Sequence, residues 1–297
     1  MYRFVICDVF TDRRFGGNPL AVVPDASGLD DTSMQQIARE FGFSETTFVL
    51  PAESGQTRRV RIFTPAAEIP FAGHPNLGTA WVLARDGLLG DLTETQHIVF
   101  EEAAGLVPIE VGVAGGKPAR CELAAPQPLH VGDEVPAERA AAAAGLTPED
   151  IATKVHPPQV VSIGLPFLIV ALETRDALER ARPDARVLEA FGAEGLPGDL
   201  HLYTVSNDDF DLRTRMFAPL GGIPEDPATG SANCTLGALL AHCDPTRDGT
   251  WRWKIAQGVE MGRPSTLYAT AVKRDGAVTE ARIAGDSVFV AEGRIDA

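Results

Sequence analysis

The chain of 297 residues lacks an excess of positive charge. It carries 26 Lys and Arg against 41 Asp and Glu, a formal net charge of −15. Proteins that bind nucleic acids or anionic membranes need a basic face, so the charge balance argues against both partners. It does not argue against a small anionic substrate, because local dipoles and one or two side chains can outweigh the global field.

Metal-binding and membrane-spanning patterns are absent as well. The four cysteines form no Cys-x-x-Cys pair and the six histidines no His-x-x-x-His pair, so we expect no metal site. Cys7 and Cys234 lie in apolar patterns typical of buried free thiols. No apolar run approaches membrane-spanning length and no signal peptide precedes Tyr2, which predicts a cytoplasmic protein. No Gly-Lys-Ser/Thr sequence indicates a Walker A loop.

What the chain does contain is a motif written twice. Arg61-Ile-Phe-Thr-Pro65 and Arg215-Met-Phe-Ala-Pro219 share Arg, Phe and Pro at an offset of 154 residues. After a two-residue contraction, His74-Pro-Asn-Leu-Gly-Thr-Ala80 matches Asp226-Pro-Ala-Thr-Gly-Ser-Ala232. Each copy is typical of a strand, a Gly/Pro-rich turn and the start of a helix.

A second similarity precedes this motif in both halves. Gly17-Asn-Pro-Leu-Ala-Val-Val23 resembles Gly164-Leu-Pro-Phe-Leu-Ile-Val170. Two similarities in the same order indicate an internal duplication. The break at Pro126-Gln-Pro128 places a domain boundary nearby, which gives an N-terminal half of residues 1–125 and a C-terminal half of residues 126–297. A strand at about 284–297 is expected to cross back and complete the first half.

Apolar periodicity predicts an α+β fold. Two helices, 75–84 and 231–241, are apolar on most sides and are expected to be buried. A helix at 33–41 has a candidate capping box in Ser33 and Gln36, and Gly42 as its stop. Strands without strict helix alternation argue against a parallel Rossmann sheet and for antiparallel sheets. Further elements are a strand pair at 98–107 and 109–113, helices at 136–144, 176–181 and 184–191, and a helix opened by Thr147.

The duplicated turns are candidate binding sites for a small carboxylate. The first backbone N–H groups of a helix lack partners and its dipole is positive there, so a helix start favours an anion. Two such half-sites related by a pseudo-twofold axis would face each other across a domain cleft.

Three residues near these turns could carry acid–base chemistry. His74 replaces Asp226 between the copies, and a helix start would lower its pKa and keep it neutral, so we favour a functional role over a structural one. Asp226 is almost equally consistent with a capping acid. Glu45 is either a solvated strand end or a cleft group whose pKa is raised by burial.

Hydroxyl groups follow each turn. For Ser231, beside Asp226 in a Gly-rich loop, we favour function, whereas Thr79 is interpreted as a cap of the first helical turn. Cys234 lies one helical turn beyond Ser231 and is expected to point into the core.

Together these features resemble the PhzF-like family of phenazine biosynthesis, within the diaminopimelate epimerase-like fold, over essentially the whole chain. The resemblance implies two halves, each a strongly curved, barrel-like antiparallel sheet around a central helix, with the active site between them and a homodimer as the assembly. The segments that carry it are Asp8-Val-Phe-Thr11 with Gly17-Asn-Pro-Leu20, Phe43-Ser-Glu-Thr46, Phe71-Ala-Gly-His-Pro75 and Glu225-Asp-Pro-Ala-Thr-Gly-Ser-Ala232.

The resemblance also implies roles for single residues. The implied catalytic residues are Glu45 as the acid–base group, His74, Asp226 and Ser231. The implied substrate-binding residues are Asn18, Gly73, Thr229 and Gly230. Related epimerases and proline racemases use two cysteines at the paired helix starts, where this chain has Gly73 and Thr229, so two-thiol racemisation is lost.

These residues predict a cofactor-independent isomerase that moves a proton along a small cyclic or unsaturated carboxylate. A single carboxylate can take a proton from one carbon and return it to another on the same face. The best-known family activity is isomerisation of trans-2,3-dihydro-3-hydroxyanthranilate. The alternatives are an epimerase or racemase, with His74 and Asp226 as the second base, and a non-catalytic carboxylate-binding protein.

Overall fold

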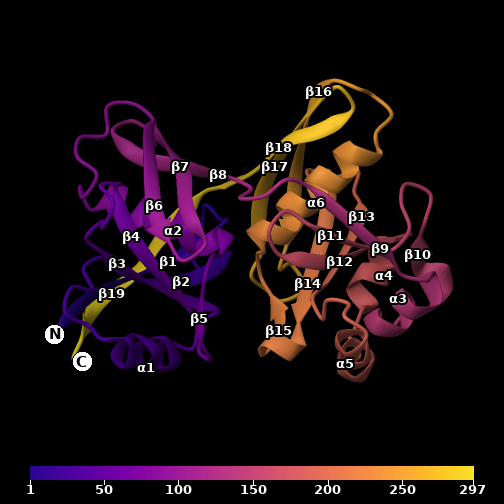
Figure 1. Ribbon diagram of the computed structural model, residues 1–297, viewed down its shortest axis with the longest axis horizontal. Helices are drawn as coiled ribbons and strands as arrows, with labels where there is room; N and C mark the ends of the chain where they lie inside the picture. Colours follow the sequence, from indigo (N-terminus) through magenta and orange to yellow (C-terminus); the bar gives the residue numbers. More distant parts are fainter. The chain divides into compact units, whose positions relative to one another are not determined.

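The computed structural model describes all 297 residues and confirms an α+β protein. The chain forms two compact units, residues 1–124 with 284–297, and residues 125–283. The C-terminal residues return to the first unit because β19 (Ser287–Ile295) pairs antiparallel with β1 (Tyr2–Val9) along the whole strand, which places the two termini side by side (Figure 1).

The first unit holds nine strands and two helices. Besides β1 and β19 they are β2 (Asn18–Val23), α1 (Asp31–Phe41), β3 (Glu45–Leu50), β4 (Arg58–Phe63), β5 (Glu68–Ile69), α2 (Gly73–Arg85), β6 (Gln96–Glu102), β7 (Gly105–Ala114) and β8 (Lys117–Ala124). Strand β1 pairs antiparallel with β2, β2 parallel with β3, and β3 antiparallel with β4. Strand β4 pairs antiparallel with β5 and parallel with β6, and β6 to β8 form an antiparallel meander.

The second unit repeats this order of pairings. Its main elements are β9 (His130–Glu134), α3 (Ala137–Ala144), β10 (Ile151–Ala152), β11 (Gln159–Ser162), β12 (Pro166–Leu172), α4 (Arg175–Arg180), α5 (Ala185–Ala193), β13 (Leu200–Val205), β14 (Leu212–Ala218), β15 (Ile223–Asp226), α6 (Gly230–Cys243), β16 (Gly249–Gln257), β17 (Ser265–Arg274) and β18 (Ala277–Gly285). From β11 to β17 the pairings are antiparallel, parallel, antiparallel, antiparallel, parallel and antiparallel. The predicted pseudo-twofold axis stays a prediction.

The prediction of purely antiparallel sheets is wrong, because each unit has a mixed sheet. The parallel pairs are β2 with β3, β4 with β6, β12 with β13, and β14 with β16. A helix lies in the connection between the strands of every one of these pairs. Parallel neighbours require such a crossover, whereas a short turn can only reverse the chain.

Helices α2 and α6 are buried, as predicted. Every residue of α2 from Gly73 to Ala84 is buried, and the helix packs on β1, β2, β3, β7 and β8 (Figure 1). In the second unit α6 packs on β16 and β17. In α2, a Cβ at Gly78 would lie 2.6 Å from Leu20 Cδ2 and 2.7 Å from Val9 Cγ2, so a larger residue there would force these core side chains to shift.

Several element ends differ from the predictions. Helix α1 begins at Asp31, and Asp30 is its N-cap, whose carboxylate accepts from the Ser33 N–H at 2.8 Å, so the proposed Ser33–Gln36 capping box is wrong. The left-handed Gly42, at φ 65°, ends the helix as predicted. Helix α2 begins at Gly73, two residues before the predicted start.

Two further predictions fail where the chain turns or pairs early. The predicted strand 98–107 ends at Glu102, because β6 and β7 reverse before Gly105, which has φ 120°. The helix predicted from Thr147 is one 3₁₀ turn, Pro148–Asp150, because the chain then pairs at once as β10 with β12.

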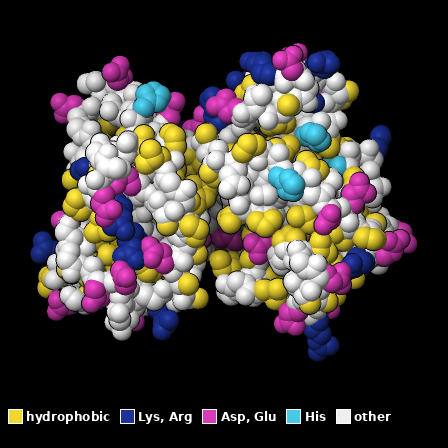
Figure 2. All heavy atoms as spheres, in the orientation of Figure 1, with side chains coloured by type: hydrophobic (Ala, Val, Ile, Leu, Met, Phe, Trp, Pro, Cys, Tyr) yellow, Lys and Arg dark blue, Asp and Glu magenta, His cyan; other side chains and the backbone are white.

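Charges of both signs are mixed on the surface. On the face shown in Figure 2, basic side chains lie interspersed with acidic ones. Arg61, for example, contacts Asp31 and Glu68, each at 2.6 Å. No helix of the structure is long and apolar enough to cross a bilayer.

Candidate active site

The first unit brings Glu45 and His74 together. Glu45 is the first residue of β3 and His74 the second of α2, and these two elements pack on each other. His74 Nε2 lies 3.4 Å from Glu45 Oε2, and the two side chains are 5% and 12% exposed. A nearly buried carboxylate therefore faces a buried imidazole.

Asn18 sets the orientation of that imidazole. Its Nδ2 lies 3.3 Å from His74 Nδ1 in a buried contact between β2 and α2. An amide NH₂ group only donates, so with this amide assignment His74 Nδ1 accepts the hydrogen bond. The proton of the neutral ring then sits on Nε2, on the side of Glu45.

His74 is neutral. Its burial lowers the pKa to about 3. The cause is desolvation of the imidazolium by burial. At neutral pH the ring is thus a hydrogen-bond donor from Nε2 and not a cation.

Neither duplicated turn has a capping side chain at its helix start. Ala72 is the N-cap of α2 and Thr229 that of α6, no side chain caps either helix, and no acid lies in either first turn. The interpretation of Thr79 as a cap is wrong: it lies beyond the first turn, and its hydroxyl meets that of Thr47 on β3 at 2.7 Å. At the N-termini of both α2 and α6, the first backbone N–H groups are therefore available to bind an anion.

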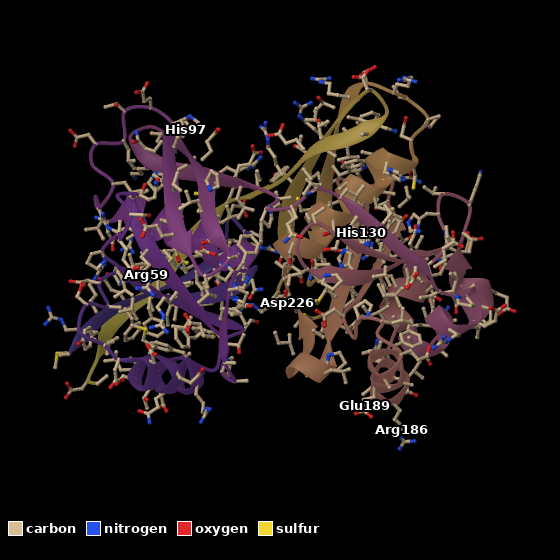
Figure 3. All side chains as sticks on the ribbon, in the orientation of Figure 1. Arg59, His97, His130, Arg186, Glu189 and Asp226 are labelled. Atoms are coloured by element: carbon tan, nitrogen blue, oxygen red, sulfur yellow. The ribbon has the colours of Figure 1, made fainter.

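In the second unit Asp226 is the last residue of β15, just before the turn that leads into α6 (Figure 3). Asp226 is 7% exposed, and its Oδ2 accepts from the Thr229 hydroxyl. Gln257 Nε2 donates to the Asp226 carbonyl at 2.7 Å and to Thr229 Oγ1 at 3.0 Å. Gly230 and Ser231 are the first two residues of α6.

Gln257 and Asn233 shape this turn and were missed by sequence reasoning. Gln257 Oε1 accepts from the Thr229 N–H at 3.1 Å and from Asn233 Nδ2 at 2.6 Å, and Asn233 Nδ2 also donates to the Thr229 carbonyl at 2.9 Å. Both side chains are fully buried. Gln257 ends a strand 28 residues beyond Thr229, and no local pattern connects the two.

The structure thus assembles Asn18, Glu45 and His74 in one unit, and Asp226 with Thr229 in the other. Their joint use on one substrate stays a prediction. His97 and His130 do not join them, because both lie on the surface (Figure 3). Cys234 is 2% exposed, which confirms its place in the core. No group of three or more His, Cys, Asp and Glu side chains could hold a metal ion.

Comparison with known proteins identifies relatives along the whole chain. A family model described as phenazine biosynthesis-like protein matches residues 7–293. An uncharacterised isomerase of Mesorhizobium japonicum is 37% identical, over 98% of both chains. A trans-2,3-dihydro-3-hydroxyanthranilate isomerase of Pseudomonas aeruginosa is 36% identical, over 99% of both chains.

A solved structure extends the agreement to the fold. The PhzF-family phenazine biosynthesis protein of Bacillus anthracis matches with a TM-score of 0.89 at 29% identity, covering 100% of this chain and 99% of that one. Curated relatives over the full length are isomerases, which confirms the predicted enzyme class. The chain belongs to the phenazine biosynthesis-like (PhzF) protein family.

Proposed function

We propose that this protein is a cofactor-independent isomerase in which Glu45 moves a proton between two carbons of a small cyclic or unsaturated carboxylate. The observation that carries the proposal is the nearly buried Glu45 carboxylate beside a neutral His74. A base that also returns the proton must be easy to protonate and to deprotonate.

The neutral state of His74 matters for this task. A cationic imidazolium 3.4 Å away would hold the Glu45 carboxylate in its charged form and weaken it as a base. A neutral His74 with its proton on Nε2 instead faces the carboxylate at 3.4 Å without fixing it in the charged form, so the basicity of Glu45 stays available. Asn18 keeps the ring in the tautomer that does this.

The remaining predicted residues would bind the substrate carboxylate and stabilise the developing enol or dienol. The uncapped helix starts at Gly73 and Gly230 offer backbone N–H groups, and such preorganised donors stabilise charge where it develops. Asp226, Ser231 and Thr229 are proposed as further polar contacts to the same substrate.

The substrate class follows from the same chemistry and from the relatives. A curated relative acts on trans-2,3-dihydro-3-hydroxyanthranilate, a ring carboxylate that suits a proton shift. We propose a ring carboxylate with a movable double bond as the substrate here. A racemase needs acids on both faces of one carbon, and neither Gly73 nor Thr229 can supply one.

The test is substitution of Glu45 by the isosteric Gln. With trans-2,3-dihydro-3-hydroxyanthranilate as the first probe, Glu45→Gln should lower kcat by about 10²- to 10⁴-fold, with proton transfer followed by NMR in deuterated water. If the wild type converts a substrate and Glu45→Gln transfers the proton on it at the same rate, the mechanism is refuted.

The product distinguishes the alternatives. Deuterium introduced with inversion at one carbon would favour the epimerase. A bound ligand that shows neither exchange nor conversion would favour a carboxylate-binding protein. We expect instead a proton delivered to a different carbon on the same face.

A further inference from the structure

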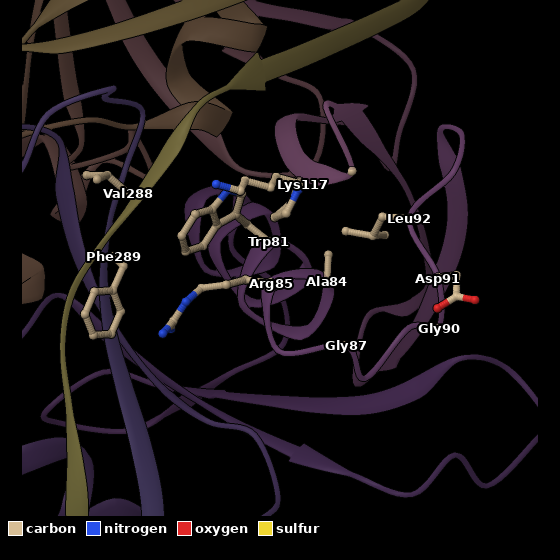
Figure 4. Close-up of a pocket in the computed structure, with 12 residues that line it drawn as sticks. Trp81, Ala84, Arg85, Gly87, Gly90, Asp91, Leu92, Lys117, Val288 and Phe289 are labelled. Carbon is tan, nitrogen blue, oxygen red and sulfur yellow. The ribbon is translucent and has the colours of Figure 1, made fainter.

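A pocket lies at the opposite end of helix α2 from His74. It has a volume of about 630 Å³ and is formed within the first unit by the last turns of α2, the segment that follows, the turn between β7 and β8, and β19 (Figure 4). Pockets of this size hold small organic molecules. Arg85 lies eleven residues beyond His74 in the same helix, which is about 16 Å along the axis.

The pocket contains a buried donor, Arg85 Nη1, that forms a long ion pair with Asp86 but no hydrogen bond. The carboxylates of Asp86 and Glu292 lie 3.5 Å and 3.9 Å from the Arg85 guanidinium. Both are already held at 2.6 Å by Arg3. Arg3 bonds Asp86 Oδ2, whereas Arg85 Nη1 faces Asp86 Oδ1 at 3.5 Å. Since Arg85 Nη1 forms no hydrogen bond there, it has hydrogen-bonding capacity left for a ligand.

The walls of the pocket are aromatic and bear both signs of charge. The Arg85 guanidinium lies over the Phe289 ring, 4.0 Å from its centroid. Figure 4 shows Trp81 between Lys117 and Arg85, while Asp91 lies on the other side of the view from Phe289. Cations and flat rings toward one end and an acid at the other suit a flat, polar molecule.

We propose that this pocket binds a small ring carboxylate that carries an amino group. The carboxylate would accept from Arg85 Nη1 and pair with Lys117, the ring would lie against Trp81 and Phe289, and the amine would face Asp91. A phosphate dianion fits less well, because Asp91 and the negative end of α2 both oppose a second negative charge. The site is separate from Glu45 and does not depend on the proposed isomerase reaction.

The test is calorimetric titration of the full chain with 4-aminobenzoate. Arg85→Met should weaken binding at least tenfold, and Lys117→Gln should weaken it severalfold. Glu45→Gln should bind as the wild type does, and so should Lys154→Gln, an exposed lysine of the second unit that serves as a charge-matched control. Circular dichroism checks that each variant is folded.

Three results would each overturn the proposal. The first is that the wild type shows no saturable binding up to ~10 mM ligand, a range that still detects weak affinity for a small ligand. The second is that wild type and Arg85→Met bind the ligand equally well. The third is that Glu45→Gln loses binding, which would place the ligand in the other site. If Arg85→Met does not fold, binding by Lys117→Gln decides the question, because Lys117 is an exposed residue at the start of β8.

Discussion

At the scale of single residues, the candidate site depends on which hydrogen-bond partner each polar atom finds. His74 is neutral because it is buried, and its tautomer follows from one contact with Asn18. The same logic applies on the other face of α2, where Glu102 is buried near Asn76. Each case gives a test in which a single hydrogen bond or charge is changed.

The tautomer of His74 should depend on Asn18. Asn18→Leu removes the amide that donates to Nδ1, so the ring can place its proton on either nitrogen. We expect kcat/KM to fall about 10- to 100-fold, the loss typical when a partner that orients a functional histidine is removed. Nitrogen NMR of the His74 ring reports the tautomer directly. A variant with normal activity and an unchanged Nε2–H tautomer would contradict the assigned role.

Glu102 should make stability depend on pH. Both of its carboxylate oxygens are buried, and this burial, partly offset by the neighbouring Asn76 side chain, raises the pKa to about 8 from an ordinary 4.5. Between these values the folded state keeps a proton that the unfolded state has lost, so stability falls as pH rises. From pH 5 to pH 8, the free energy of unfolding of Glu102→Gln should therefore rise relative to that of the wild type, by at most about 1.4 kcal/mol per pH unit.

Urea unfolding at several pH values measures this gain. Glu101→Gln is the matched neighbour, because the Glu101 carboxylate accepts from Ser54 and from the Glu53 and Gln56 N–H groups, which lower its pKa to about 2. That variant should lose stability at neutral pH instead. A constant difference between Glu102→Gln and wild type across the range would show that Glu102 ionises normally.

At the scale of elements, close packing of α2 on its strands fixes where the His74 turn lies. The helix approaches β1 and β2 at Gly78, where a larger residue would force core side chains to shift. In the second unit, side-chain hydrogen bonds hold the corresponding turn. Gln257, at the end of β16, forms hydrogen bonds with both Asp226 and Thr229. Helix packing thus positions one turn, and a buried amide positions the other.

Gly78→Ala should destabilise the protein despite the better helix propensity of Ala. The new Cβ would meet Leu20 Cδ2 at 2.6 Å and Val9 Cγ2 at 2.7 Å, and overpacking of a core costs about 1–3 kcal/mol. Gly192→Ala is the control, because Gly192 lies in α5 with nothing within 4 Å of its added Cβ. It should gain up to about 1 kcal/mol. Chemical unfolding of both variants gives the comparison, and a stabilised Gly78→Ala would contradict the packing argument.

At the scale of the whole molecule, the first unit is closed by residues from the far end of the chain. Strand β19 covers β1 from Tyr2 to Val9. It also supplies Phe289, which packs on Arg85, and Glu292, which pairs with Arg3. The predicted homodimer is a separate question and stays a prediction.

Removal of residues 287–297 should unfold or loosen the first unit. Without β19 the backbone groups of β1 lose their partners on one side and become an open sheet edge. We expect the amides of β1 that bond β19 to lose protection in hydrogen exchange, together with a lower thermal midpoint. Removal of residues 296–297 alone, which lie beyond β19, is the control. Unchanged protection of β1 in the longer deletion would contradict this role.

The sequence by itself determined the features that depend on local pattern. Apolar periodicity identified α2 and α6 as buried helices, and the repeated motif located the two turns with His74 and Asp226 at matched positions. Glu45 and His74 were singled out by residue type and by the family resemblance. These features are local because the apolar periodicity of a helix and the residue types of a turn can be recognised within a few consecutive residues.

Only the tertiary structure decided the contacts between distant segments. The Asn18–His74 contact joins residues 56 positions apart, and Gln257 reaches Asp226 from 31 positions away. The parallel strand pairs, the return of β19 and the pocket around Arg85 are equally non-local. Such partners are selected by packing of the whole unit, because a buried polar atom must bond whichever group the fold places beside it.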